Sequence, residues 1–122
     1  MATNFEEYIF KMAEEAPHAV VLDWYRRLEL MVRSYLETRA IHWRSAYAAE
    51  SVIARDALLG SNVAAAMSKL RTARNGVAHT GDHVSFDTAI GFARDSFSLI
   101  GVLLQAQDAN ADISSLAAGT QH

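Results

Sequence analysis

Apolar side chains recur every three or four positions along most of the chain, which is the spacing of an α-helix with one buried face. The first stripe begins at Phe5, reaches Met12 and predicts a helix over about residues 3–15. A broader stripe follows Pro17 and predicts a long second helix over about residues 17–46. Proline fits there because the first turn of a helix does not use its missing N–H group.

Two shorter stripes predict helices over about residues 48–60 and 62–74, with Gly60 ending the first and Ser61 capping the second. The segment that follows, RNGVAHTGDHVS, contains two glycines and predicts a turn. A last helix is predicted over about residues 85–107. Its stripe, spaced 4, 3, 4, 3 and 4 residues apart, is Phe86, Ile90, Ala93, Phe97, Ile100 and Leu104.

Residues 108–122 carry no apolar stripe, so we expect a frayed end there. The chain shows neither the alternation of a β-strand nor an internal repeat. With 122 residues it suits a single domain, 1–122, and its 51% hydrophobic content is enough for one core. The pattern therefore predicts an all-α fold, an antiparallel bundle of four to five helices.

Composition removes several classes of protein. The chain has no cysteine, which excludes disulfides, cysteine–zinc sites and thiol nucleophiles. No run approaches the ~18–20 apolar residues of a membrane span, and the start, MATNFEEYIF, is acidic where a signal peptide is basic. We therefore expect a cytoplasmic protein without membrane contact.

The net charge of -3 is unevenly distributed along the chain. Residues 1–25 carry a net charge of -4, residues 26–74 carry +5, and residues 75–122 carry -4. The total argues against a uniformly basic nucleic-acid coat, whereas the basic middle segment can still form a local positive face. Charges that only solvate helix surfaces are the alternative.

Two weak metal motifs are present. Glu15 and His18 have the Glu-x-x-His spacing of carboxylate-bridged di-iron bundles, but Pro17 lies between them and no second copy exists. His79 is followed by Asp82 and His83, a short cluster that is more typical of exposed loop residues than of a metal site. The sequence thus predicts no metal and no cofactor.

His42 lies beside Trp43 on the predicted long helix and is expected to be a packing residue. The chain has no Gly-x-Ser-x-Gly nucleophile motif and no glycine-rich phosphate loop. The remaining candidate is an arginine and a histidine five positions apart, Arg74 and His79, at the junction of a predicted helix and turn.

This segment, LRTARNGVAHTG, resembles the Arg-x(4–6)-His motif of HEPN domains (higher eukaryotes and prokaryotes nucleotide-binding), in which a polar residue, here Asn75, often follows the arginine. The segment PHAVVLDWYRRLELMVRSYLE is similar to the long early helix of these domains, including its Leu28–Glu29 pair. The resemblance spans roughly residues 17–107.

The resemblance implies a metal-independent endoribonuclease with Arg74 and His79 as catalytic residues and Asn75 in support. Histidine titrates near neutral pH and suits proton transfer, while arginine suits the charge on a phosphoryl group. One motif supplies a single histidine, so the resemblance implies a homodimer in which two motifs share a cleft around RNA. Arg71 and Lys69, one turn earlier, are expected to extend a positive rim for the RNA backbone.

One departure concerns the toxin members of the family, which pair with an antitoxin and commonly carry a tyrosine two residues after the histidine. Here Thr80 and Gly81 follow His79. Some HEPN-like domains are non-catalytic modules that bind a nucleotide or a protein partner, and this alternative stays open. A structural role is a further alternative, because Arg74 near a helix end can bind free carbonyl groups and Asn75 can open a chain reversal.

Overall fold

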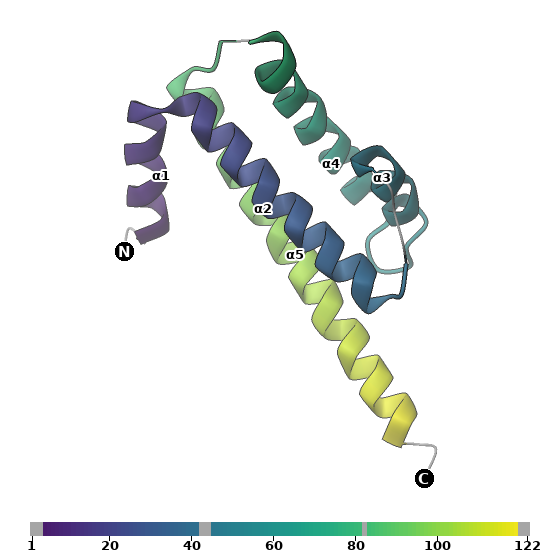
Figure 1. Ribbon diagram of the computed structural model, residues 1–122. Coiled ribbons are helices and arrows are strands. Elements are labelled where there is room, and N and C mark those ends of the chain that lie inside the picture. The colour runs from purple at the N-terminus through teal and green to yellow at the C-terminus, as the bar shows by residue number, and fades with distance from the viewer. Residues whose placement is uncertain (1–3, 42–44, 82, 120–122) are drawn as a thin grey trace.

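The computed structural model describes residues 4–41, 45–81 and 83–119, with side chains as far as Ala111. In these ranges the chain forms five α-helices and no strand (Figure 1): α1 (Asn4–Glu15), α2 (Pro17–Thr38), α3 (Ala46–Ala54), α4 (Gly60–Asn75) and α5 (Phe86–Gly119). A π-helical turn, η1 (Gly76–Thr80), continues α4. The predicted all-α bundle is confirmed.

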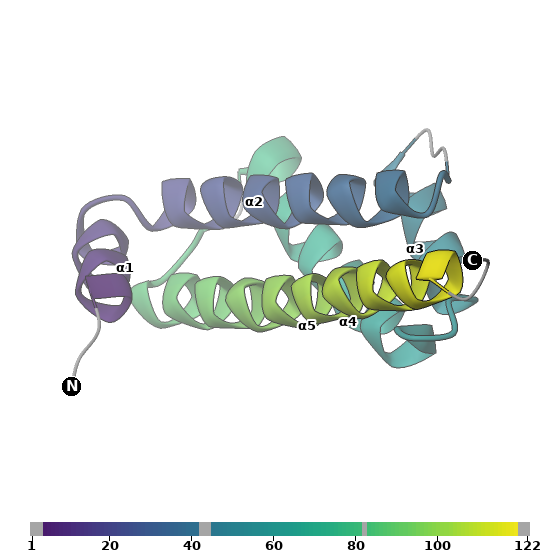
Figure 2. The ribbon, with the colours of Figure 1, turned by 90° about the horizontal axis from the view of Figure 1, so that it is seen from below.

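The two longest helices, α2 and α5, lie side by side and run in the same direction (Figures 1 and 2). The ring of Trp24 lies 6.2 Å from that of Phe97, and the Ser34 hydroxyl donates a hydrogen bond of 3.3 Å to Gln107. Both pairs are 73 positions apart, so the register is constant. Helix α4 comes between α2 and α5 along the chain and runs in the opposite direction. The successive long helices α2, α4 and α5 therefore alternate in direction.

The core lies mainly along the α2–α5 contact and reaches the inner faces of α1, α3 and α4. The largest fully buried side chains are Tyr35, Leu28, Leu36, Ile53, Leu103, Val20, Val21 and Ser96. Burying one large aliphatic side chain contributes about 1.5–3 kcal/mol. The large apolar members of this set that lie on α2 and α5 therefore stabilise the pairing of these two helices.

A polar network closes the end of the bundle remote from α1. The Tyr35 hydroxyl donates to Asp56 at 2.8 Å, and the Arg39 guanidinium donates to the same carboxylate oxygen at 3.0 Å. The other Asp56 oxygen accepts the backbone N–H of Leu58. Asn110 donates to the Tyr35 hydroxyl at 3.3 Å, so the network joins α2, the α3–α4 loop and α5.

The predicted bounds of three helices, α2, α3 and α4, differ from those in the structure. Helix α2 ends at Thr38 rather than near residue 46, because Ala40 takes a left-handed conformation with φ 56° that stops the helix. Helix α3 spans Ala46–Ala54 rather than 48–60, and Ser45 caps it by accepting the Ala48 N–H.

Helix α4 begins at Gly60 rather than at residue 62, since Gly60 (φ 81°) opens this helix instead of ending the one before it. The predicted packing role of His42 beside Trp43 falls outside the described residues.

The predicted end of the last helix and its frayed tail are also wrong. The backbone of α5 continues to Gly119, and its C-terminal end extends past the end of α2 (Figure 1). Residues 108–118 contain neither proline nor glycine, so nothing in the local sequence ends the helix before Gly119.

The predicted stripe of α5 is buried only in part. Ile90 and Ala93 are buried, whereas Phe86, Phe97 and Leu104 are exposed at 38%, 51% and 49%. Helix α5 contacts α1 and α4 as well as α2, so its buried arc is wide and turned away from the stripe. The buried positions of α5 are Ala89, Ile90, Phe92, Ala93, Ser96, Leu99, Leu103 and Ala106.

One segment of the described chain, Phe86–Ala111, is long and apolar enough to cross a membrane by length and composition, with a mean hydropathy of 1.2. The apolar runs of the sequence alone predicted no such segment. Core helices of soluble proteins meet the same criterion, and 44% of the apolar window is buried within the bundle.

Candidate functional site

The Arg-x4-His segment lies where α4 passes into η1. The Arg74 guanidinium donates a hydrogen bond of 3.0 Å to the side-chain oxygen of Asn75. It also lies 5.4 Å from the centre of the Tyr25 ring, which comes from α2. Arg74 and Asn75 are therefore brought together, and a half-buried Arg74 is held against α2 by a cation–π contact.

The turn predicted for residues 74–85 is helical as far as Thr80. Gly76 keeps a right-handed helical conformation (φ -58°), and the first left-handed residue is Gly81 (φ 67°), whose N–H bonds back to the Gly76 carbonyl. This bond joins residues five apart, as in a π-helix. The Thr80 hydroxyl donates to the same carbonyl at 2.5 Å.

The π-helical turn affects where His79 lies relative to Arg74. In a π-helical turn, residues five apart point in more similar directions than they do in an α-helix, and Arg74 and His79 are five apart. The His79 side chain is exposed to solvent. Single π-turns within helices are frequent at functional sites, which fits a candidate site at this position.

Arg71, one turn before Arg74, is engaged in an ion pair. Its Nε and Nη2 donate to the two carboxylate oxygens of Glu50 on α3, at 2.5 and 3.2 Å. The Glu50 side chain is only 10% exposed. These hydrogen bonds raise the pKa of Arg71, and the carboxylate neutralises its charge locally. Arg71 therefore shares a face with Arg74 but adds little net positive charge to it.

Lys69 lies on a different face of α4. It lines a shallow groove between α4 and α5 together with Asp95 and Ser98. The continuous positive rim expected from Lys69, Arg71 and Arg74 does not form in the described chain, because residues two and five apart on an α-helix point in different directions.

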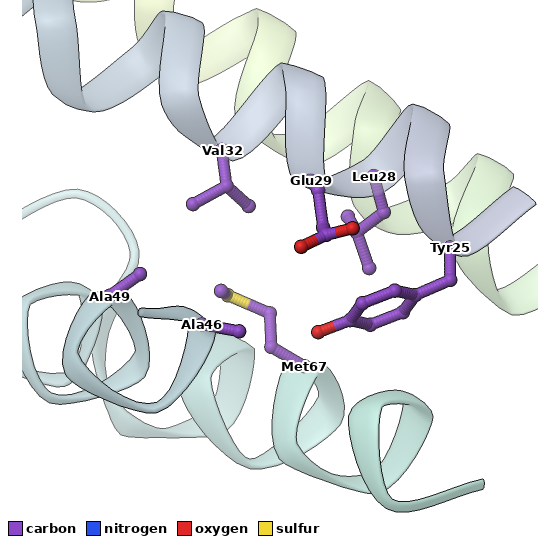
Figure 3. A pocket seen from close by; sticks show the side chains of 7 residues that line it. All are labelled: Tyr25, Leu28, Glu29, Val32, Ala46, Ala49 and Met67. Atoms are coloured by element: carbon purple, nitrogen blue, oxygen red, sulfur yellow. The ribbon is translucent and has the colours of Figure 1, made fainter. Parts of the chain in front are cut away.

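A small pocket adjoins the motif where α2, α3 and α4 meet (Figure 3). Its walls are Leu28, Val32, Ala46, Ala49 and Met67, and its polar groups are the Tyr25 hydroxyl and the Glu29 carboxylate. The free volume is about 20 Å³, room for one water molecule.

Tyr25 connects this pocket to the motif, because its ring also contacts Arg74. Burial, followed by the nearby charges of Glu29 and Glu50, raises the pKa of Tyr25 to about 12. The hydroxyl is therefore a neutral hydrogen-bonding group at physiological pH and not a general base.

The sequence pattern misses three residues of this site. Tyr25 reads only as core, Glu50 lies 21 positions from Arg71, and Tyr47 lies in the first turn of α3. A repeated i, i+3 spacing could have indicated Tyr47 and Glu50. These two residues have that spacing on one helix, and Arg71 and Arg74 have it on the next.

The weak metal motifs do not assemble in the described residues. Helix α1 ends at Glu15 and α2 begins at Pro17, so Glu15 and His18 do not share a continuous helix. The rings of His18 and His83 lie 6.5 Å apart, edge to face. Asp82 falls outside the described residues, and within them no group of three or more His, Asp and Glu side chains could hold a metal ion.

No protein-family profile, curated protein or solved structure matches this chain. The resemblance to HEPN domains therefore depends on the sequence of the motif alone.

Proposed function

We propose that the chain is a HEPN-type, metal-independent endoribonuclease that acts in the cytoplasm as a homodimer. The observation that carries the proposal is the arrangement at the end of α4: Arg74 is hydrogen-bonded to Asn75, and His79 is exposed one π-helical turn further on. An arginine held in place and an exposed histidine on the next turn of the helix suit cleavage of RNA without a metal, because one can stabilise phosphoryl charge and the other can transfer protons.

The reaction is attack of an RNA 2′-oxygen on the adjacent phosphorus. A base takes the 2′-hydroxyl proton, the P–O5′ bond breaks, and an acid protonates the leaving 5′-oxygen, which leaves a 2′,3′-cyclic phosphate and a 5′-hydroxyl. His79 suits either proton transfer, because histidine is the side chain that most often serves as general acid or base. Arg74 suits the negative charge on the phosphoryl oxygens, and Asn75 orients it through their hydrogen bond.

The two proton transfers need two groups, and the motif supplies one exposed histidine. A homodimer with the motifs facing across a two-fold axis supplies the second, from His79 of the partner subunit. Monomers of this chain are then expected to be inactive.

A second candidate function is a non-catalytic module that binds a nucleotide or a protein partner, an antitoxin included. The observation that favours it is that Arg71 and Arg74 already have partners within one chain, Glu50 for the first and Tyr25 with Asn75 for the second. In that case their role is to hold α4 against α2 and α3.

The test is incubation of the purified chain with single-stranded RNA in the presence of EDTA. We expect cleavage that leaves 2′,3′-cyclic phosphate ends, detected by mass spectrometry, and its loss in His79→Ala. His83→Ala is the matched control, since His83 is also exposed and follows the same turn. Arg74→Lys is expected to retain folding but to lose most activity, because a lysine lacks the planar donor geometry.

Unchanged cleavage in His79→Ala would exclude the catalytic assignment. Absence of cleavage by the parent chain, with binding of a nucleotide that Arg74→Ala abolishes, would favour the non-catalytic module.

A further inference from the structure

Two arginine–tyrosine stacks lie on one face of α4. Arg74 stacks on Tyr25 of α2 at 5.4 Å, and Arg71 stacks on Tyr47 of α3 at 5.6 Å. The two arginines are three positions apart, so the stacks are neighbours along the helix.

The stacks differ in exposure. Tyr25 is only 5% exposed to solvent, whereas Tyr47 is 68% exposed. No other large hydrophobic residue in the described chain is as exposed as Tyr47. Burying an aromatic ring is among the larger contributions that a side chain makes to binding, so a ring left open on a candidate site is a candidate contact.

The cation that contacts the Tyr47 ring is held in place by an ion pair. Its cation partner, Arg71, is fixed by two hydrogen bonds to Glu50, a residue only 8% exposed. Arg71 cannot swing away without leaving that carboxylate unpaired, which is costly. The guanidinium next to the ring is therefore fixed while the ring itself is exposed to solvent, and this lowers the ordering cost of a further stacking partner.

We propose that Tyr47 is a stacking subsite for one base of single-stranded RNA, outside the Arg74–His79 motif. The inference rests on the proposed ribonuclease function and extends it to how the substrate is held. Aromatic rings bind bases of single-stranded RNA by stacking, with little preference for sequence. The guanidinium of Arg71 behind the ring strengthens such a stack.

The spacing suits a short stretch of RNA. Arg71 and His79 are eight residues apart, which corresponds to about 12 Å along a helix at 1.5 Å per residue. A chain of a few nucleotides reaches from a base on Tyr47 to a phosphate at His79. The Arg71–Glu50 pair is neutral overall, so this subsite contributes base stacking rather than phosphate attraction.

The nature of the subsite predicts a preference for single strands. Bases within a duplex already stack on their neighbours and leave no free face for Tyr47. The subsite is thus expected to discriminate unpaired from paired RNA without reading base identity.

The test uses the full chain with His79→Ala, so that bound RNA stays intact, and a fluorescein-labelled single-stranded oligoribonucleotide followed by fluorescence anisotropy. Adding Tyr47→Ala is expected to weaken binding about tenfold. Tyr47→Phe is expected to keep the affinity, since stacking needs the ring and not the hydroxyl. Tyr8→Ala is the matched control, because Tyr8 is 49% exposed on α1, remote from the motif in sequence.

The same strand annealed to its complement is expected to show no difference between the Tyr47 variants. Thermal melting checks that each variant is folded. Equal single-strand affinity with and without Tyr47→Ala, or an equal loss on the duplex, would overturn the proposal. So would a change of oligomeric state in Tyr47→Ala on sedimentation, which would assign the ring to a protein contact.

The two proposals fail in different ways. If His79→Ala still cleaves RNA, the catalytic assignment fails, and the Tyr47 comparison in the parent chain with a non-cleavable 2′-O-methyl RNA still tests the subsite. If cleavage depends on His79 and affinity does not depend on Tyr47, the stacking subsite alone fails.

Discussion

The α2–α5 pair and the α3–α4 hairpin are both packed helix pairs, but different interactions hold them. Large side chains such as Tyr35, Leu36 and Leu103 are fully buried between or beside α2 and α5. The hairpin meets α2 where Ala49 and Met67 line a small pocket, and through the cation–π contact of Arg74 with Tyr25. The ion pair of Arg71 with Glu50 joins its two helices.

The difference separates stability from chemistry. Apolar burial scales with the area removed from water, so the α2–α5 pair contributes more to the free energy of unfolding than the hairpin does. The polar groups of the candidate site collect where the hairpin meets α2, in the less apolar contact. Binding and catalytic groups are commonly found in such less stable parts of a protein.

The largest expected effect comes from breaking the α2–α5 pair. Leu103→Ala removes a side chain that is 0% exposed, and we expect a loss of about 3 kcal/mol in the free energy of unfolding. Leu104→Ala makes the same chemical change at the next position, which is 49% exposed, and is expected to cost well under 1 kcal/mol. Urea denaturation of both variants measures the contrast, and equal losses would contradict the assignment of the core.

The second prediction concerns the hairpin contact and uses pH. The pKa of Tyr25 is about 12 in the folded chain and 10.0 in its ordinary state, so the folded chain holds this proton more tightly. The resulting stability is complete below pH 10 and is lost as the pH rises toward 12. At about pH 11 this loss amounts to roughly 1 kcal/mol.

Tyr25→Phe isolates that contribution, because the other groups that titrate at high pH remain. The parent chain is expected to lose more stability than Tyr25→Phe between about pH 9 and about pH 11, measured by urea denaturation. Tyr47→Phe serves as control, since Tyr47 is exposed, and should behave as the parent chain does. Parallel curves for the parent and Tyr25→Phe would mean that the hydroxyl is not buried at the hairpin contact.

The smallest expected effect is a gain in stability within α5. A Cβ at Gly91 would meet nothing within 4 Å, so Gly91→Ala is expected to stabilise the helix by about 0.7 kcal/mol. Gly81→Ala is the matched contrast, since Gly81 has φ 67°, and is expected to destabilise by about 1 kcal/mol. A loss of stability in Gly91→Ala would show that another surface approaches this face of α5.

Helix spacing alone was enough to predict the fold class and the extent of α1, because periodic apolar residues report a buried face directly. The end of α2, both ends of α3 and the start of α4 were missed, since such boundaries depend on single backbone conformations, such as the left-handed Ala40 at the end of α2. The buried arc of α5 was missed because it is set by three neighbouring helices, which a stripe on one helix does not reveal.

The candidate site divides in the same way. The contact between Arg74 and Asn75 follows from adjacency in the chain, and the exposure of His79 follows from its place in a segment with two glycines. The neutralisation of Arg71 depends on Glu50, 21 residues away on another helix, and no local pattern carries that information. Helical geometry alone could have predicted that Lys69 and Arg74 lie on different faces of α4, because they are five residues apart.

In the π-helical turn, the direction of the His79 side chain depends on the number of residues that precede it in the turn. A turn of this width is equivalent to an α-helical segment that has gained one residue. Side chains on its surface can change without rotating His79 about the helix axis, whereas one deletion between Gly76 and Ala78 turns it by roughly a quarter of a circle. The segment is therefore tolerant of substitution and intolerant of changes in length.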